Sequence, residues 1–221
     1  MYPSLAATFV SSSTARSSWS ASLSAAPRLV RYCRLPGSSA TAFSNDPTAA
    51  AALAELQKAV ELEPKNAEAQ YQLGYVQLFM KQSSAAALGP FEKAVSLEPA
   101  NVQYRTSLGA ALNEANQLDR AVEELTKVVS SDGYKGWDAP FYLGAAQLKN
   151  KRYKEATAAF EQSLAVKADN AQAEGMLAWC YVGLKDTDNF KVHGAKAKKL
   201  GYKDPDLMNR LAQVEAGQKF K

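Results

Sequence analysis

The feature that most constrains the fold is a nine-residue phrase that occurs twice, 35 positions apart. The chain reads Lys-Ala-Val-Glu-Leu-Glu-Pro-Lys-Asn at residues 58–66 and Lys-Ala-Val-Ser-Leu-Glu-Pro-Ala-Asn at residues 93–101. Proline lacks an N–H and ends a helix, and the asparagine that follows suits a turn and the next helix N-terminus. A phrase that recurs at this spacing between helix-compatible segments is typical of stacked helical hairpins, which build extended surfaces rather than catalytic pockets.

Other positions recur with the same period. Leu-Gly pairs recur at 73–74, 108–109 and 143–144. Thirteen or fourteen residues after the leucine of each of these pairs comes a small residue, and a large apolar residue follows four positions later. Glycine and alanine allow two antiparallel helices to cross closely, while the large residues form an apolar helix face. We therefore assign a role in the repeat architecture to Leu73, Gly74, Ala87, Phe91, Pro99, Leu108, Gly109, Ala121, Leu143, Gly144, Ala156 and Phe160.

This pattern resembles the tetratricopeptide repeat (TPR), a 34-residue helical hairpin with Leu-Gly early, Ala and Phe in the middle and Pro at the end. The resemblance implies an all-α fold: a right-handed α-solenoid of antiparallel hairpins, with about four to five repeats. The expected units are a disordered leader at 1–45, a half-repeat helix at 46–66, repeats at 67–101, 102–136 and 137–170, a degraded repeat at 171–200, and a capping helix with tail at 201–221.

The C-terminal units depart from the repeat. Ala178 replaces the glycine, Phe190 stands where alanine is expected, and Gly194 stands where an aromatic residue is expected. Asp204-Pro205 then forms a good helix start, which predicts a lone terminal helix that caps the array.

The segment 130–137 carries two glycines in place of the compact proline turn. It is interpreted as an altered inter-repeat loop, with a binding loop that presents Tyr134 and Trp137 as the alternative.

The first 45 residues differ from the rest in composition. They contain no Asp, Glu or Lys, but four arginines and many serines. Such a segment cannot bury enough apolar surface to order itself, and this composition is also typical of a mitochondrial or plastid transit peptide. A flexible tail on a cytoplasmic protein, or a start codon placed too far upstream, are the alternatives. No stretch approaches 18 consecutive apolar residues, so the sequence predicts no transmembrane helix.

Charge does not point to a nucleic-acid partner. The chain has 26 basic and 22 acidic residues, and removing the leader's four arginines leaves 22 of each. The lysines between Lys185 and Lys203 are interpreted as a solvated helix face, with a patch for RNA or an acidic partner as the alternative. Outside the leader there is one histidine, His193, and one cysteine, Cys180, so we expect no catalytic site, metal or cofactor.

The resemblance implies that the first helix of each hairpin lines a concave groove. Positions matched by phase include the aromatic residues Tyr71, Tyr75, Phe79, Phe141 and Trp179. Aromatic side chains are frequent anchors for a peptide or helix of a partner, although they can equally pack against the neighbouring hairpin.

Related proteins that hold chaperone C-termini clamp the carboxylate with Lys, Asn and Arg. The corresponding positions here are Tyr71, Tyr75, Ser107, Asp138 and Tyr142, so no carboxylate clamp is expected. The expected function is therefore non-catalytic binding of a protein or peptide. A structural subunit or assembly factor of a larger organellar complex, or an RNA-associated factor, are the alternatives.

We expect residues 1–45, fused to a fluorescent reporter, to carry it into an organelle, because arginine-rich, acid-free leaders are recognised by organellar import. Fluorescence microscopy checks this, with the reporter fused to residues 46–221 as the control. A diffuse cytosolic signal from the leader fusion would contradict it.

Overall fold

The computed structural model describes residues 47–79 and 84–220, with side chains described from residue 53 and excluding residue 79. The leader and its expected disorder lie outside these residues. The described chain forms helices α4 (Pro47–Leu62), α5 (Ala67–Phe79), α6 (Ser84–Leu97), α7 (Val102–Glu114), α8 (Leu118–Val129), α9 (Asp138–Lys149), α10 (Tyr153–Val166), α11 (Ala171–Gly183), α12 (Thr187–Lys199) and α13 (Pro205–Glu215).

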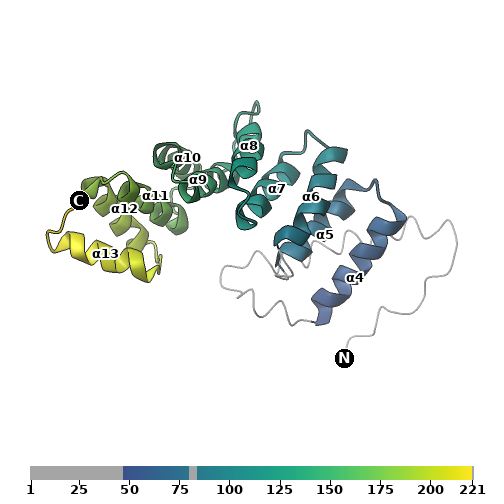
Figure 1. The fold of residues 1–221 in the computed structure, drawn as a ribbon, viewed down its shortest axis with the longest axis horizontal. Coiled ribbons are helices and arrows are strands. Elements are labelled where there is room, and N and C mark those ends of the chain that lie inside the picture. The colour runs from purple at the N-terminus through teal and green to yellow at the C-terminus, as the bar shows by residue number, and fades with distance from the viewer. Residues whose placement is uncertain (1–46, 80–83, 221) are drawn as a thin grey trace.

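The helices follow one another in an elongated row from α4 at one end to α13 at the other (Figure 1). Hairpins α5/α6, α7/α8, α9/α10 and α11/α12 stack in sequence, because the second helix of each packs against the first helix of the next. Helix α4 packs against α5 through Leu53 and Leu56, and α13 packs against α12. The predicted all-α solenoid of helical hairpins is confirmed.

Within each regular hairpin the glycine of the Leu-Gly pair meets a large side chain of the second helix. A Cβ atom at Gly74 would lie 3.0 Å from the Phe91 ring, and one at Gly144 would lie 3.0 Å from the Phe160 ring. At Gly109 a Cβ atom would overlap the Leu125 side chain. The glycine thus recurs because the two helices cross closely enough to leave no room for a side chain.

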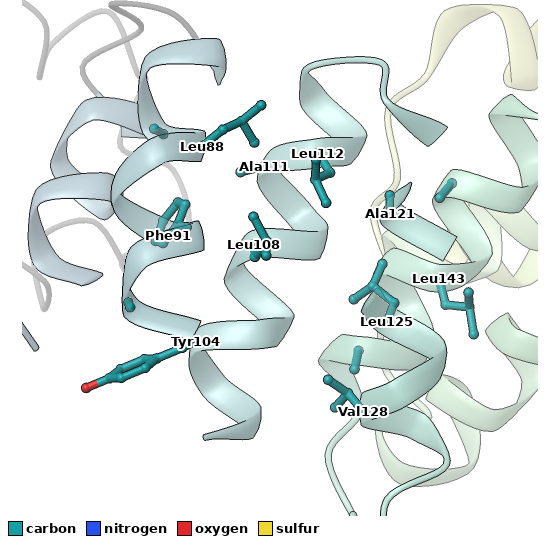
Figure 2. Packing of buried hydrophobic residues seen from close by; sticks show 14 of the residues in the cluster. Leu88, Phe91, Tyr104, Leu108, Ala111, Leu112, Ala121, Leu125, Val128 and Leu143 are labelled. Carbon is teal, nitrogen blue, oxygen red and sulfur yellow. The ribbon is translucent and has the colours of Figure 1, made fainter. Parts of the chain in front are cut away.

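The buried side chains form one cluster from α5 to α10, a second from α9 to α13 and a small third between α4 and α5. Figure 2 shows labelled residues of the first cluster on the successive helices α6, α7, α8 and α9. The assigned architecture residues Leu73, Ala87, Phe91, Leu108, Ala121, Leu143, Ala156 and Phe160 are all buried, at 7% exposure or less. Pro99 is exposed in the turn between α6 and α7.

The repeated phrase forms the same turn twice. In the first copy, Asn66 donates from Nδ2 to Glu63 Oε2 (3.2 Å) and accepts at Oδ1 from the Ala69 N–H (3.0 Å). In the second copy, Asn101 donates to Glu98 Oε2 (3.2 Å) and caps α7 by accepting from backbone N–H groups. An asparagine cap of this kind contributes about 1 kcal/mol to stability.

The departures in the fourth hairpin make room for α13. The bulky Phe190 is fully buried one helical turn before the position where an aromatic residue is expected. A Cβ atom at that position, Gly194, would lie 3.2 Å from Leu211 of α13. Asp204 caps α13 by accepting from the Leu207 N–H (2.9 Å). The exchange of a large and a small residue thus allows the terminal helix to pack closely.

We expect Gly109→Val to lower the free energy of unfolding by about 1–3 kcal/mol, because the new side chain overlaps Leu125 at the helix crossing. The matched control is Ala158→Val at an exposed position of α10, where only helix propensity changes and the loss stays below about 1 kcal/mol. Urea denaturation measures both values. Equal losses for the two variants would show that the crossing has no special packing constraint.

Candidate protein-binding groove

The five predicted groove residues divide by exposure. Tyr71 and Phe141 are buried, at 6% and 7% exposure, and so take part in packing within the array. Tyr75 and Trp179 are only partly buried and retain surface that a partner can contact. Phe79 lies in α5, but its side chain is outside the described residues. The structure therefore divides the four described side chains into a buried pair and a partly exposed pair.

Tyr71 belongs to a polar and aromatic cluster that joins α5 to α7. Its ring stacks on Tyr104 with a centroid separation of 4.8 Å, and its hydroxyl accepts a hydrogen bond from Gln103 Nε2 (3.0 Å). The Tyr104 hydroxyl donates to Glu68 Oε2 (2.8 Å), and burial together with this carboxylate raises the pKa of Tyr104. Sequence reasoning missed Tyr104, although its place at the start of a first helix, next to the preceding repeat, is a signal for this contact.

Phe141 packs inside the third hairpin. Its ring meets Phe160 edge-on at 5.9 Å and Trp137 at 6.1 Å. Lys167 Nζ lies 4.3 Å from the centre of the Trp137 ring. Phe141 is therefore enclosed by its own hairpin and by the loop before α9.

Tyr134 in the same loop holds the start of α9. Its hydroxyl donates to Asp138 Oδ1 (2.5 Å) and accepts from the Ala139 N–H (3.0 Å). Burial and the Asp138 carboxylate raise the pKa of Tyr134. The two aromatic residues of the loop thus make contacts within the chain.

The accessible Trp179 lies beside a hollow between α11 and α13, with a volume of about 300 Å³. The hollow is lined by Trp179, Asp206, Asn209, Arg210 and Gln213. Helix α13 was expected only to cap the array, but it also lines this surface. If α13 is counted from Pro205 as a further first helix, its groove positions 2, 5 and 9 are Asp206, Asn209 and Gln213. The repeat spacing could therefore have predicted that α13 lines this surface.

The lysine-rich last hairpin contains a buried carboxylate. Glu174 is fully buried, with His193 Nδ1 2.8 Å from Oε2 and Lys196 Nζ 2.5 Å from Oε1. Glu174 Oε1 and Lys196 Nζ form an ion pair, but their geometry does not make a hydrogen bond. Lys196 therefore pairs with a buried charge although its own side chain is 48% exposed, and Lys191, Lys198 and Lys199 are also exposed.

The described part of the chain also contains a cysteine thiol, and its surroundings make it unreactive. Cys180 is fully buried, and burial raises the pKa of its thiol to about 12, which disfavours the reactive thiolate. Over residues 47–79 and 84–220 there is no group of side chains arranged to hold a metal ion. No helix in those ranges is both long and apolar enough to cross a membrane.

Comparison with known families gives two matches. The family described as TPR repeat matches residues 50–82, and the family described as tetratricopeptide repeat matches residues 106–173. No curated protein sequence matches the chain.

Several solved structures share the fold. PilF of Pseudomonas aeruginosa is 21% identical with a TM-score of 0.67, covering 76% of this chain and 78% of its own. YrrB, titled a TPR protein with an unusual peptide-binding site, is 24% identical with a TM-score of 0.63, covering 79% and 88%. MamA AMB-1 is 20% identical with a TM-score of 0.63, covering 73% and 94%. The repeated hairpins, the glycine crossings and the two family matches together show that the chain carries tetratricopeptide repeats within residues 50–82 and 106–173.

Proposed function

We propose that this chain is a non-catalytic protein-binding module that holds a peptide or helical segment of a partner along its first helices α5, α7, α9 and α11. The observation that carries the proposal is the partial exposure of Tyr75 and Trp179, two aromatic residues at equivalent groove positions of α5 and α11. Tyrosine and tryptophan supply large contact areas at low entropic cost, which makes them frequent binding anchors.

The surface between the two aromatic residues is suited to a peptide. Lys149 of α9 reaches back to α7, where its Nζ lies 3.1 Å from the Asn113 carbonyl oxygen and 3.8 Å from Glu114 Oε1. The Lys149 side chain thus links the adjacent first helices α7 and α9, and its positive charge compensates the negative charge of Glu114 in the middle of the groove. The peptide-binding site named for the TPR protein YrrB, which has the same fold, supports the same class of ligand.

The proposal is tested by selecting from a random-peptide display library against the full chain. We expect wild type to enrich a family of related peptides. Tyr75→Ala and Trp179→Ala should each weaken binding of those peptides at least about five-fold, since truncating an interface anchor costs about 1 kcal/mol or more. Fluorescence anisotropy with labelled selected peptides measures the affinities.

The control is Val192→Ala, which truncates an apolar side chain 61% exposed on the second helix α12 and should leave affinity unchanged. Tyr71→Ala serves as a contrasting variant, because removing this buried ring should destabilise the array by about 3–5 kcal/mol. A failure to enrich any peptide, or wild-type affinity in both groove variants, would contradict the proposal. Self-association of the chain in that case would favour the structural-subunit alternative.

A further inference from the structure

We propose that the C-terminal end of the groove holds an anion-binding subsite, centred on Arg210, which takes a carboxylate from an acidic segment of the bound partner. This inference rests on the proposed peptide-binding function and names the chemistry of the ligand at one end of it. Three independent features of the described chain support it: an unpaired arginine, a fixed position for that arginine, and a cationic cavity around it.

Arg210 differs from the other arginines that the structure describes. Arg105 pairs with Glu124, Arg120 lies 2.6 Å from Glu92 Oε1, and Arg152 lies 2.8 Å from Asp119 Oδ1. Within residues 53–78 and 84–220, no carboxylate forms an ion pair with Arg210. Its five N–H donors are thus available for an acceptor from another molecule.

Arg210 is held in place by two aromatic rings. Its guanidinium carbon lies 5.9 Å from the centre of the Trp179 ring and 5.6 Å from the centre of the Phe220 ring. Both distances lie within the range of a cation–π contact, which favours a position of the guanidinium near the two rings. The group is therefore positioned before a ligand arrives, so less side-chain entropy is lost when a carboxylate binds.

The Phe220 ring is itself anchored. After α13 the chain turns at Gly217, whose φ of +95° lies in the left-handed region. The Phe220 N–H donates to Thr187 Oγ1 (3.1 Å), and its ring packs edge-on against the buried Phe190 at 5.0 Å. The C-terminal tail thereby returns to the start of α12 and closes one side of the subsite.

The cavity beside Arg210 has a volume of about 280 Å³ and a positive lining. It is lined by three cationic residues, two amides and a smaller apolar part: Lys185, Arg210, Lys219, Gln213, Gln218, Val182, Gly183, Val214 and Phe220. None of these described lining residues is acidic. Because no described carboxylate lines the cavity, its three cations repel one another, and an anion in the cavity relieves that repulsion.

The surroundings favour a peptide carboxylate as the source of the anion. The cavity shares Arg210 and Gln213 with the hollow beside Trp179, so a segment in the groove continues into it. Asp206 lines that hollow but not the cationic cavity, which confines the attraction to one end. The amide, cationic and apolar residues that line the cationic cavity suit acidic and apolar side chains of a peptide. A polynucleotide prefers a longer basic stripe with open aromatic faces, and Arg210 lies against the Trp179 ring here.

The test measures binding of two labelled peptides to the full chain by fluorescence anisotropy. One is a flexible peptide of repeated Glu-Gly-Leu-Tyr, and the other replaces every glutamate with glutamine. We expect the glutamate peptide to bind about ten-fold more tightly. Arg210→Gln should remove that advantage, so that the ratio of the two affinities falls to about one. Arg210→Lys should retain part of the advantage, because it keeps the charge and loses the planar fork.

Two further variants make the result specific. Lys185→Gln removes a second cation of the cavity and should lower the affinity for the glutamate peptide about three-fold. This variant keeps the inference testable if Arg210→Gln fails to fold. Arg152→Gln removes an arginine that is paired with Asp119 and should preserve the full difference between the peptides.

Equal affinity for the two peptides, or an undiminished glutamate advantage in Arg210→Gln and Lys185→Gln, would overturn the inference. Displacement of the glutamate peptide by inorganic phosphate or by polyuridine RNA at lower concentration would also overturn it, because the subsite would then be a phosphate site. If both peptides bind equally and Tyr75→Ala weakens both, the anion subsite is excluded while the groove is retained. If the peptide library enriches nothing, yet Arg210 still confers the glutamate advantage, the groove proposal fails by itself.

Discussion

The close crossing of two helices at a glycine is the contact on which the rest of this structure depends. At Gly74 and Gly144 the first helix lies against a phenylalanine ring of the second, and at Gly109 it lies against Leu125. Burying one such side chain contributes about 1.5–3 kcal/mol, and a hairpin alone leaves much of its apolar face uncovered. Stability therefore comes from stacking, and the position of each hairpin follows from that of its neighbours.

A close contact at a glycine also occurs at the C-terminal end of the array, between α12 and α13. In the fourth hairpin the large residue moves to Phe190 and the small residue to Gly194, so α12 packs against α11 and also approaches Leu211 of α13 closely at Gly194. The weakening of the repeat pattern is thus a packing adjustment for a terminal helix. It also places Phe220 against Phe190 and Arg210 between two rings, which gives this end of the groove a chemistry that the regular repeats lack.

The division of the groove aromatics bears on how a partner would bind. Tyr71 and Phe141 stabilise the stacking, whereas Tyr75 and Trp179 present surface at separate points along the array. A partner that contacts both must extend across several hairpins, which suits an extended or helical segment more than a compact ligand. The buried Glu174, with its ion pair to Lys196, adds a reason for lysine in the last hairpin that is independent of any partner.

The sequence by itself determined the helical hairpins, their order and their turns, because these depend on residues close together in the chain. Glu-Pro-x-Asn ends one helix and caps the next, and Leu-Gly marks the crossing, so both could be recognised from spacing alone. Which aromatic residues remain accessible was decided only by the tertiary structure. Tyr104 from the next hairpin covers Tyr71, and the loop residue Trp137 packs against Phe141. The cation–π contacts of Arg210 likewise required α11, α13 and the C-terminal tail to meet, since exposure and charge pairing depend on neighbours that are distant in sequence.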